Sequence, residues 1–364
     1  MKVAVLELHY HEEFLNTIID LFDDVDVYTT HKIYARLPET SKNKGVFYFC
    51  IKNKYRFLKT LQQLSSQYDV LFVNTIQPSM IDLPLYTNFK PKCKSVLTLH
   101  NLNAWNNNKF VYDKQFLRSV DSFIASRYSK KILNNFNIIN VVYEPMICVA
   151  EKYFKKPIIN IPYALSRSQV QPIENNILDL VIPGTVDEKR RDYNPVIHAY
   201  GKLCKKYDNI SLVLLGKLKD YKYLNSCEHI KTFDEFVSLQ TYNHYLEQSD
   251  VVICPSQKTT ESVNMVVEMY GSTKSSNVHE AFIRQKPLLV PNYINTPKNF
   301  QSSTKKYSKN YESIYIILKE FLDNPDELNI IKNNAVINSN YYSKQKVYKQ
   351  FKHSLFVDGE NELL

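Results

Sequence analysis

A strand-then-helix pattern recurs along most of the chain, and it is the feature that most constrains the fold. The first apolar run, VAVLEL at residues 3–8, is followed at residues 14–22 by apolar side chains at helical spacing. Similar strand-length runs lie at residues 24–30, 46–51, 69–75, 95–101, 122–126, 141–144 and 158–162. Strands that alternate with helix-length segments predict a doubly wound parallel sheet.

The pattern starts again after a polar segment. Residues 166–178 lose apolar periodicity and include a proline, as expected of an interdomain linker. Further strands are expected at 179–184, 210–216, 230–233, 250–256 and 287–291, and helices near 193–207, 236–248, 277–285, 311–323, 326–338 and 341–353. A chain of 364 residues is long enough for two domains.

We therefore predict an α/β fold with two Rossmann-like doubly wound parallel-sheet domains. The first domain is expected at residues 1–168 and the second at 179–340. The C-terminal segment, 341–364, is predicted to be a helix that packs back on the first domain.

Composition excludes several functional classes. Six glycines in the whole chain leave no GxGxxG or Walker loop, so phosphate binding must use other donors. The six cysteines form no CxxC pair and are expected to be buried thiols in a reducing compartment. No export signal and no apolar run of about 20 residues is visible, so the expected location is cytoplasmic.

Positive charge is concentrated in the first half of the chain. Residues 1–170 carry a net charge of +8 and the remainder +1, so we expect the first domain to face an anionic partner. The segment KNKYRFLKTLQQL at 52–64 is consistent with contact with an anionic membrane, or with an ordinary helix that buries Leu58, Leu61 and Leu64. No RNP, KH or zinc-finger pattern supports nucleic-acid binding.

Two clusters of polar residues follow predicted strands of the first domain. Ligands of open parallel sheets bind beyond the carboxyl ends of the strands. His9, His11 and Glu12 follow the first strand, where the alternative is a polar loop that opens a helix. His100 and Asn101 follow the TLH strand, where a neutral imidazole could accept or orient an acceptor hydroxyl proton, or serve only as a loop histidine.

A third cluster follows the first strand of the second domain. The sequence GTVDEKRRDY places Lys189, Arg190 and Arg191 a few residues after Gly184. Guanidinium groups are planar donors with a permanent charge and suit phosphate oxygens, so we favour phosphate binding over a solvated basic loop.

A fourth cluster precedes the helix expected at 277–285. Lys274, Ser275, Ser276 and Asn277 lie where free backbone N–H groups could hold a diphosphate. The alternative is structural, because Asn277 with Glu280 also fits a capping box.

Two other kinds of site have no support in the sequence. The nine histidines are dispersed and no HxxxH or HExxH occurs, so no metal site is expected. No GxSxG elbow and no kinase loop set is present.

Four segments, IPGTVDEKRRDY, ISLVLLGK, YLEQSDVVICPS and YGSTKSSNVHEAFIRQKPLLVP, resemble in order and spacing the donor domain of GT-B glycosyltransferases, nearest to the retaining, family-four-like group. The resemblance covers residues 179–295 well and the rest of the chain more loosely. It implies the α/β GT-B architecture, in which two Rossmann-like doubly wound parallel-sheet domains face a cleft. Glycosyltransferases of that group carry an Arg and a Lys that bind the donor diphosphate. Gly184 matches their strand-ending glycine, Thr185 stands in place of the Arg, Arg191 falls at the Lys position, and Arg190 is near enough to substitute.

The resemblance also assigns two further positions. Glu280 matches the glutamate that binds the donor ribose, while Ser272 stands where relatives have a first glutamate, for which Glu268 could substitute through a longer loop. His100 matches the place of a histidine that faces the acceptor.

The resemblance implies a hexosyltransferase-like enzyme of cell-surface polysaccharide or glycoconjugate synthesis, acting with retention and without a metal or other cofactor. It would move a sugar from a UDP- or GDP-linked donor to a glycan or lipid-linked acceptor, with peripheral contact at the inner face of the cytoplasmic membrane. The implied catalytic residues are His100 and Arg191; donor-binding residues are Gly184, Thr185, Arg190, Arg191, Lys274, Ser275, Ser276, Asn277 and Glu280; acceptor-binding residues are His9, His11, Glu12 and Asn101.

Two alternatives remain open at this point. The replacements at Thr185 and Ser272 also suit a noncatalytic GT-B-like subunit that binds a nucleotide or a glycan. A nucleotide-sugar epimerase would share the two-domain architecture and the use of a helix N-terminus for diphosphate.

Overall fold

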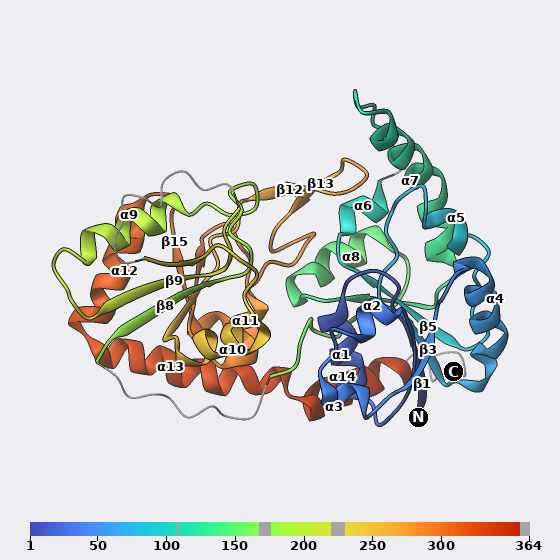
Figure 1. Cartoon of the computed structure of the whole chain (residues 1–364), viewed down its shortest axis with the longest axis horizontal. Coiled ribbons are helices and arrows are strands. Elements are labelled where there is room, and N and C mark those ends of the chain that lie inside the picture. Colours follow the sequence, from blue (N-terminus) through green and yellow to red (C-terminus); the bar gives the residue numbers. More distant parts are fainter. Residues whose placement is uncertain (108, 167–175, 220–229, 357–364) are drawn as a thin grey trace. The chain divides into compact units, whose positions relative to one another are not determined.

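A computed structural model describes residues 1–107, 109–166, 176–219 and 230–356 (Figure 1). Most of the linker expected at 166–178 lies outside the described residues. Contacts divide the chain into two compact units. The first unit comprises Met1–Ala164, Glu261–Ser275 and Lys344–Leu364, and the second comprises Leu165–Thr260 and Ser276–Ser343.

The first unit is built on a seven-stranded, wholly parallel sheet in the order β3-β2-β1-β4-β5-β6-β7. Its strands are β1 (Lys2–Leu6), β2 (Asp24–Thr29), β3 (Val46–Phe49), β4 (Val70–Val73), β5 (Lys94–Leu99), β6 (Ile138–Val141) and β7 (Ile158–Asn160). The side chains of β4 are all buried, as expected where helices cover both faces of a parallel sheet.

The helices of the first unit follow the strands in the expected alternation. They are α1 (Glu12–Leu21), α2 (His31–Tyr34), α3 (Glu39–Lys42), α4 (Lys54–Leu64), α5 (Leu83–Tyr86), α6 (Leu102–Asn106), α7 (Phe116–Asn134), α8 (Ile147–Tyr153) and α14 (Lys344–Phe356), with short 3-10 turns at Ser65–Gln67 and Glu144–Met146. The apolar residues of α1 at helical spacing, Phe14, Leu15, Ile18 and Ile19, are fully buried.

Helix α14 packs in the first unit through an aromatic cluster. The ring centroid of Phe351 lies 5.3 Å from that of Phe22 and 5.4 Å from that of Phe72. Tyr348 lies 5.8 Å from Phe22, and Lys344 Nζ is 3.0 Å from the carboxylate of Asp23. These contacts join the last described helix to α1 and β4 of the same unit.

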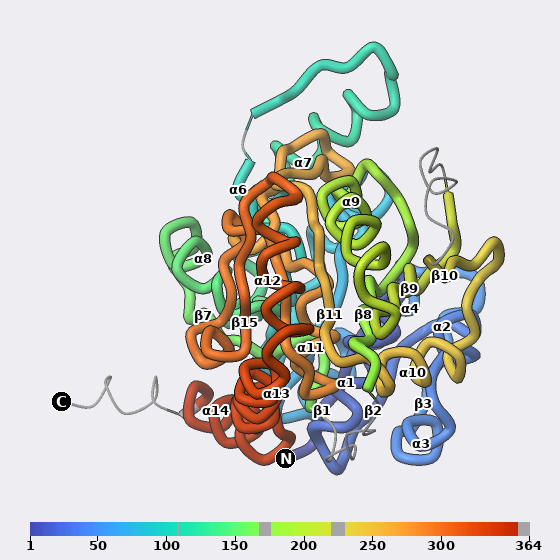
Figure 2. The backbone as a smooth tube through the Cα atoms, turned by 90° about the vertical axis from the view of Figure 1, so that its left-hand side faces the viewer, coloured from blue at the N-terminus to red at the C-terminus, as the bar shows by residue number. Residues whose placement is uncertain are grey.

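The second unit repeats the arrangement with a six-stranded parallel sheet in the order β10-β9-β8-β11-β14-β15. Its strands are β8 (Leu178–Pro183), β9 (Ile210–Lys217), β10 (Ile230–Phe233), β11 (Val251–Ile253), β14 (Leu288–Pro291) and β15 (Thr304–Tyr307). Its helices are α9 (Asn194–Leu203), α10 (Leu239–Gln248), α11 (His279–Arg284), α12 (Tyr311–Asp323) and α13 (Pro325–Ser339), with 3-10 turns at Lys298–Ser303 and Asn340–Tyr342. Figure 2 shows α9 and α12 side by side, and both contribute to one apolar core.

Apart from a few residues at the boundaries, the division between the units differs from the expected ranges in one segment. Glu261–Ser275, which the sequence pattern assigned to the second domain, lies in the first unit. The segment contains β13 (Val267–Met269), which pairs with β12 (Thr259–Glu261). It joins the first unit because its backbone and side chains hydrogen-bond to α6, a contact that spacing along the sequence does not reveal.

The strand expected at 122–126 is wrong, because these residues lie within α7. A five-residue apolar run does not distinguish a strand from a buried helical turn. The buried side chains of α7 recur at helical spacing and are Ser119, Ser122, Ala125, Ser129, Ile132 and Leu133.

Removal of the Phe351 ring should loosen α14. We expect Phe351→Ala to lower the free energy of unfolding by about 3 to 5 kcal/mol, because the ring is 2% exposed and leaves a cavity between Phe22 and Phe72. Fluorescence of the single tryptophan, Trp105, follows unfolding of the first unit in urea. Phe236→Ala, at a side chain 88% exposed, is the control and should leave the transition within about 0.5 kcal/mol. Equal transitions for both variants would contradict the assignment.

Candidate functional site

Each sheet contains one point where the order of the strands reverses direction. It lies between β1 and β4 in the first unit and between β8 and β11 in the second. Loops that leave the carboxyl ends of strands at such a point diverge, and ligands of open α/β sheets bind in the space between them. Each unit therefore has one candidate site.

Gly184 ends β8 at the reversal point of the second unit. Its φ of +89° is in the left-handed region that favours glycine. A Cβ atom here would lie 2.6 Å from Asn277 Nδ2 and 2.7 Å from Arg191 Nη2. The absence of a side chain thus lets these two polar groups close over the end of the strand.

The guanidinium of Arg191 is buried beside this glycine. The residue is 8% exposed, its Nη1 hydrogen-bonds to the carbonyl of Thr185, and its backbone forms a bridge with Ser256 after β11. No carboxylate among the described residues lies within 4.0 Å of it. A buried cation without a counter-ion is costly, so this environment suits a bound anion.

Arg284 of the same unit is a buried arginine whose charge, unlike that of Arg191, is paired with a carboxylate. It is 5% exposed, and its Nη1 lies 3.1 Å from the carboxylate of Glu247, while Nη2 donates to Asn243. The charge of Arg284 is therefore neutralised within the protein. Arg190, in contrast, has a side chain 67% exposed that lies 3.9 Å from Asp187, so it does not share the environment of Arg191.

Three predicted donor residues adjoin α11. Asn277 Nδ2 donates to the carbonyl of Pro183 at 2.9 Å, and the buried Ser276 hydroxyl has no hydrogen-bond partner among the described residues. Glu280 accepts from the Tyr242 hydroxyl at 3.0 Å. The capping-box alternative is wrong, because Val278 is the N-cap and no side chain caps the helix. The helix is also shorter than expected and begins at His279.

The remaining predicted donor residues, Lys274 and Ser275, lie in the first unit. The backbone of Lys274 forms bridges with Asn101 and Tyr270, and Leu102 N donates to the carbonyl of Thr273 at 2.9 Å. The segment that contains Lys274 thus pairs with the loop that follows β5. The sequence could not show this, because the pairing joins segments about 170 residues apart.

Two stacked imidazoles mark the reversal point of the first unit. The rings of His11 and His100 are 3.8 Å apart and inclined by 6°. His11 Nδ1 lies 3.1 Å from the Tyr163 hydroxyl, and His100 Nε2 lies 3.0 Å from the carbonyl of Asn74. A carbonyl only accepts, so His100 carries its hydrogen on Nε2 and presents an unprotonated Nδ1.

Burial keeps both imidazoles neutral. It lowers the pKa of His100 to about 4, to which the nearby charge of Lys274 also contributes. Burial likewise lowers the pKa of His11 well below its usual value, with further contributions from His100, His9 and Lys274. At neutral pH His100 is suited to orient a hydroxyl by accepting its hydrogen bond, and it is too weak a base to retain the proton.

A pocket opens at these rings. The residues that line it are Tyr10, His11, Thr75, Ile76, Gln77, Pro78, Thr98, His100, Asn101, Trp105 and Val263, all of the first unit. It combines an indole with polar groups from the ends of β1, β4 and β5, a composition typical of small-molecule sites. The buried Oδ1 of Asn101 has no hydrogen-bond partner among the described residues.

The other predicted acceptor residues make contacts outside the pocket lining. His9 Nε2 lies 3.0 Å from a carboxylate oxygen of Asp82, and burial lowers the pKa of His9 although Asp82 opposes this. Glu12 lies 3.1 Å from Arg36 Nη1. Of the four predicted acceptor residues, His11 and Asn101 line the pocket and His9 and Glu12 do not.

Sequence reasoning missed Glu7. This side chain is fully buried just after β1, where it accepts hydrogen bonds from Thr75 Oγ1 at 2.6 Å and from His9 N at 2.7 Å. Burial raises the pKa of Glu7 to about 7. It fixes Thr75, which lines the pocket. The signal was available, since an acidic residue at the carboxyl end of an apolar strand faces a functional edge of the sheet.

Glu268 supports the pocket from the segment 261–275. Its carboxylate accepts from the backbone N–H groups of Asn103 at 3.2 Å and Ala104 at 2.7 Å, at the start of α6. Burial raises the pKa of Glu268 to about 7. Both carboxylate oxygens of Glu268 are therefore engaged within the first unit. That Glu268 also serves in place of the first glutamate of the relatives stays a prediction. Glu268 holds α6, and with it Trp105.

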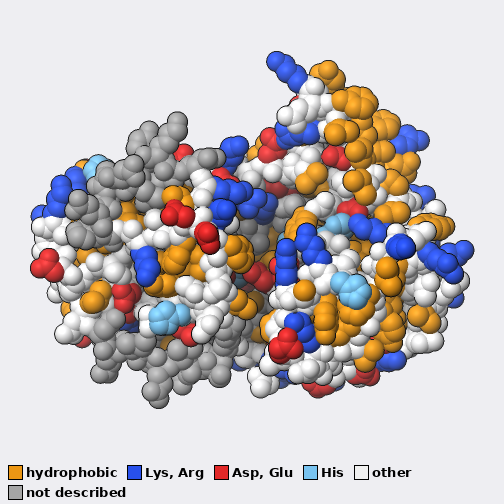
Figure 3. Space-filling model, viewed as in Figure 1, with side chains coloured by type: hydrophobic (Ala, Val, Ile, Leu, Met, Phe, Trp, Pro, Cys, Tyr) orange, Lys and Arg blue, Asp and Glu red, His pale blue; other side chains and the backbone are white. Residues whose placement is uncertain are grey.

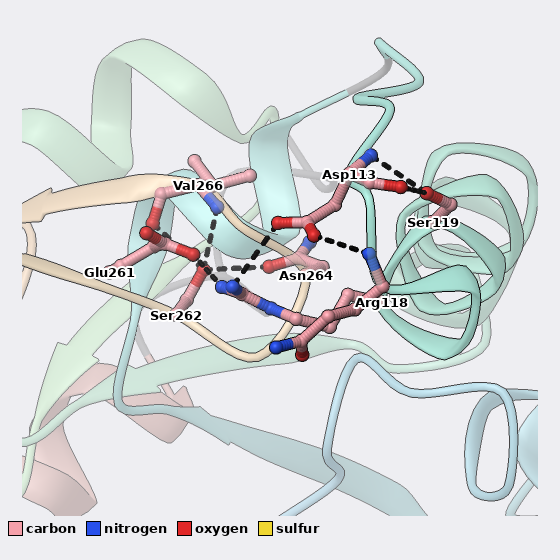
Figure 4. A network of polar contacts seen from close by, with 8 residues as sticks. Asp113, Arg118, Ser119, Glu261, Ser262, Asn264 and Val266 are labelled. Carbon is pink, nitrogen blue, oxygen red and sulfur yellow. Dashed lines mark hydrogen bonds and ion pairs between the residues drawn. The ribbon is translucent and has the colours of Figure 1, made fainter.

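Figure 4 shows how the same segment is attached to the start of α7. Arg118 lies 3.2 Å from Asp113 and also forms an ion pair with Glu261. Ser262 bonds to Asn264 at 2.7 Å, and Asn264 Nδ2 donates to the carbonyl of Ala104 at 2.9 Å. Charged and amide groups thus connect the segment to both α6 and α7.

Within the described ranges, no group of three or more His, Cys, Asp or Glu side chains is arranged to hold a metal ion. The expectation that no metal takes part stays a prediction. None of the helices in the described part of the chain is long and apolar enough to cross a membrane.

The raised pKa of Glu268 predicts a pH dependence of stability. The unfolded chain ionises this group from about pH 4.5, whereas the folded chain keeps its proton until about pH 7, so the contribution of Glu268 to stability falls as the pH rises across this window. Glu268→Gln cannot ionise. Relative to the wild type, we expect this variant to gain about 1 to 3 kcal/mol between pH 5 and pH 8 in unfolding followed by Trp105 fluorescence.

The glutamine also loses one acceptor, but this effect is the same at every pH. Glu312→Gln is the control for the loss of an exposed carboxylate. Parallel pH profiles for wild type and Glu268→Gln would contradict the assignment.

The fold is shared with solved structures. The chain is similar to HepE from Anabaena, solved in complex with UDP, with a TM-score of 0.64, 13% identity and coverage of 98% of this chain and 99% of that one. It is also similar to sucrose-phosphate synthase from Thermosynechococcus elongatus, with a TM-score of 0.61, 11% identity and coverage of 98% and 100%. A third similar structure is UDP-GlcNAc 2-epimerase from Neisseria meningitidis bound to UDP-GlcNAc, with a TM-score of 0.55, 11% identity and coverage of 98% and 100%.

No family model and no curated protein sequence matches the chain. At this level of identity the solved structures establish the fold. The two parallel-sheet, Rossmann-like units are those of the GT-B architecture, as the sequence predicted.

Proposed function

We propose that this protein is a glycosyltransferase that uses a nucleoside diphosphate sugar. The second unit would hold the nucleotide diphosphate and the first unit the acceptor. The observation that carries the proposal is the buried guanidinium of Arg191, which lies beside a strand-ending glycine of left-handed conformation and has no carboxylate partner among the described residues. A diphosphate would supply the missing negative charge.

The comparisons support a uridine nucleotide as the donor. HepE has been solved with UDP and with UDP-glucose, and the similar epimerase with UDP-GlcNAc. In the proposed site Glu280, which accepts a hydrogen bond from Tyr242, would also hydrogen-bond the ribose. Ser276 and Asn277 would bind the diphosphate.

The proposed chemistry is leaving-group stabilisation. As the bond between the sugar and the diphosphate breaks, negative charge grows on the phosphate oxygens, and Arg191 would offset it in a site of low dielectric. In the first unit the unprotonated Nδ1 of His100 would orient the attacking hydroxyl. Retention and the absence of a metal requirement are part of the proposal, supported by the resemblance of residues 179–295 to the retaining group.

The acceptor is proposed to be a glycan or a lipid-linked saccharide of a cell-surface pathway. A sugar ring packs well against an aromatic face and takes hydrogen bonds at its rim. In the pocket of the first unit, Trp105 would supply the aromatic face. His100, Asn101 and Thr75 would supply the hydrogen bonds.

An epimerase is a second candidate, favoured by the similarity to UDP-GlcNAc 2-epimerase. The two candidates are separable with the purified protein. An epimerase converts the nucleotide sugar without an acceptor, whereas a transferase releases the nucleotide only as the sugar moves to an acceptor or to water.

The first test is donor binding. A thermal-shift panel of UDP, GDP, CMP and TDP and their sugars, with and without magnesium, should show a metal-independent stabilisation by UDP and its sugars, because a ligand bound only by the native state raises its melting temperature.

We expect Arg191→Ala to weaken the binding of UDP by about 10- to 150-fold, measured by calorimetry, since one charge-assisted contact to phosphate is lost. Arg190→Ala, at the exposed neighbouring guanidinium, is the matched control and should bind UDP nearly as the wild type does. Equal affinities of the Arg191 variant and the wild type would refute the proposed diphosphate contact.

The second test concerns the acceptor. We expect His100→Ala to lower the turnover number for sugar transfer by about 10²-fold or more while leaving the affinity for UDP unchanged, because His100 lies in the first unit. Acceptor binding can be followed separately by the fluorescence of Trp105, which lines the same pocket. Wild-type turnover in this variant would assign His100 a structural role only.

A further inference from the structure

The segment from 109 to the end of α7 exposes an unusual number of large apolar side chains. Figure 3 shows hydrophobic side chains gathered over the region of α7 with basic ones beside them. Five apolar residues here are half or more exposed: Phe110 at 52%, Tyr112 at 78%, Phe116 at 77%, Leu117 at 61% and Phe123 at 50%. The opposite face of α7, from Ser119 to Leu133, is buried.

The exposed charges of the same segment are all positive. The cations are Lys109, Lys114, Arg127, Lys130 and Lys131. The two acidic residues are occupied, since Asp113 pairs with Arg118 at 3.2 Å and Asp121 accepts from Met80 N at 2.7 Å. We name the five apolar and five cationic side chains the α7 patch.

The residues of the patch are ordered along the helix. Phe116 and Phe123, seven residues apart, lie on the same face of the first turns, and Arg127, Lys130 and Lys131 continue that face toward the end of α7. An apolar end is thus followed by a basic end on one surface.

We propose that the α7 patch is a docking surface for a membrane that contains anionic phospholipids. Aromatic side chains prefer the level of the headgroups, where their rings meet both acyl chains and water. Lysine and arginine beside them gain from the negative potential of an anionic leaflet. The patch therefore has both components of interfacial binding, buried apolar area and electrostatic attraction.

Two other occupants fit the patch less well. Lysine is depleted from the cores of interfaces between proteins, whereas four of the five cations of the α7 patch are lysines. A second copy of the chain in a two-fold arrangement would bring the same cations together, and their repulsion would oppose association.

The basic segment at 52–64 is a weaker membrane candidate than the sequence alone indicated. Leu58 and Leu61 are buried in the first unit at 2% and 0% exposure, as in an ordinary amphipathic helix. Tyr55, at 56%, is the large apolar side chain that α4 leaves exposed. Of these two segments, the α7 patch exposes more large apolar side chains than α4 does.

This inference does not depend on the proposed transferase activity, because it uses neither the Arg191 site nor the pocket at His100. A result that refutes the transferase activity therefore does not refute membrane binding by the α7 patch, and the reverse also holds.

Vesicle co-sedimentation of the full chain tests the proposal. We expect the wild type to sediment with vesicles of phosphatidylcholine and phosphatidylglycerol far more than with phosphatidylcholine alone, and to be released as the salt concentration rises. Phe116→Ser with Leu117→Ser should lower the partition coefficient at least about tenfold, because two exposed apolar side chains no longer enter the interface. Lys130→Glu with Lys131→Glu should lower it by about fivefold or more for each cation removed.

Matched controls lie in other parts of the chain. Phe236→Ser with Ile316→Ser removes two equally exposed apolar side chains from the second unit, and Lys205→Glu with Lys349→Glu makes the same change in net charge. Both control variants should sediment as the wild type does. Equal loss of binding in the controls and in the α7 variants, or the absence of wild-type sedimentation with anionic vesicles, would overturn the proposal; in the second case a protein partner becomes the better occupant.

A spectroscopic variant gives an independent result. In Phe116→Trp the new indole lies on the exposed face, while Trp105 is 4% exposed and supplies a constant background. Anionic vesicles should shift the added emission to the blue, and lipids brominated along their chains should quench it. An unshifted, unquenched spectrum at saturating lipid would contradict insertion of α7.

Discussion

Parallel strands need cover on both faces, and this constraint arranges the rest of the protein. In both units the central strands are buried throughout, so they cannot carry solvated polar groups along their length. Polar and charged side chains appear instead where the strands end. Glu7, His100 and Gly184 all directly follow a strand, and each lies where the order of the strands reverses or next to that point.

Buried charge distinguishes the side chains that hold the structure from those available to a ligand. Arg284 is neutralised by Glu247, and Glu268 accepts two backbone hydrogen bonds from the start of α6. Arg191 is as deeply buried as Arg284, but its described contacts are to a carbonyl oxygen and not to a carboxylate. The same cost of burying a charge that Glu247 offsets at Arg284 is not offset by a described carboxylate at Arg191, and the proposed diphosphate contact is based on this difference.

Burial also decides what the histidines can do. The ordinary pKa of histidine would allow His100 to accept or orient a hydroxyl proton near neutral pH, which its sequence position predicted beside the alternative of a loop histidine. Within the first unit, burial lowers that pKa to about 4, so the neutral ring orients a hydroxyl more readily than it retains a proton. The side chains of the α7 patch, in contrast to His100, are exposed, so its aromatic and cationic groups are available to a membrane interface.

The sequence by itself determined the fold class, most of the strands and the loop from Gly184 to Arg191, because hydrophobic periodicity and glycine placement act over short distances along the chain. Tertiary structure decided the rest. The segment 261–275 belongs to the first unit because Glu268 and Asn264 bond to α6, about 160 residues away in sequence. Residues 122–126 belong to a helix and not to the expected strand, because α7 buries one helical face, Ser122 and Ala125 included, in the folded unit. Pairings between distant segments leave no periodic signal in the sequence, and for this reason the pocket of the first unit and the exposed face of α7 could be located only in the folded protein.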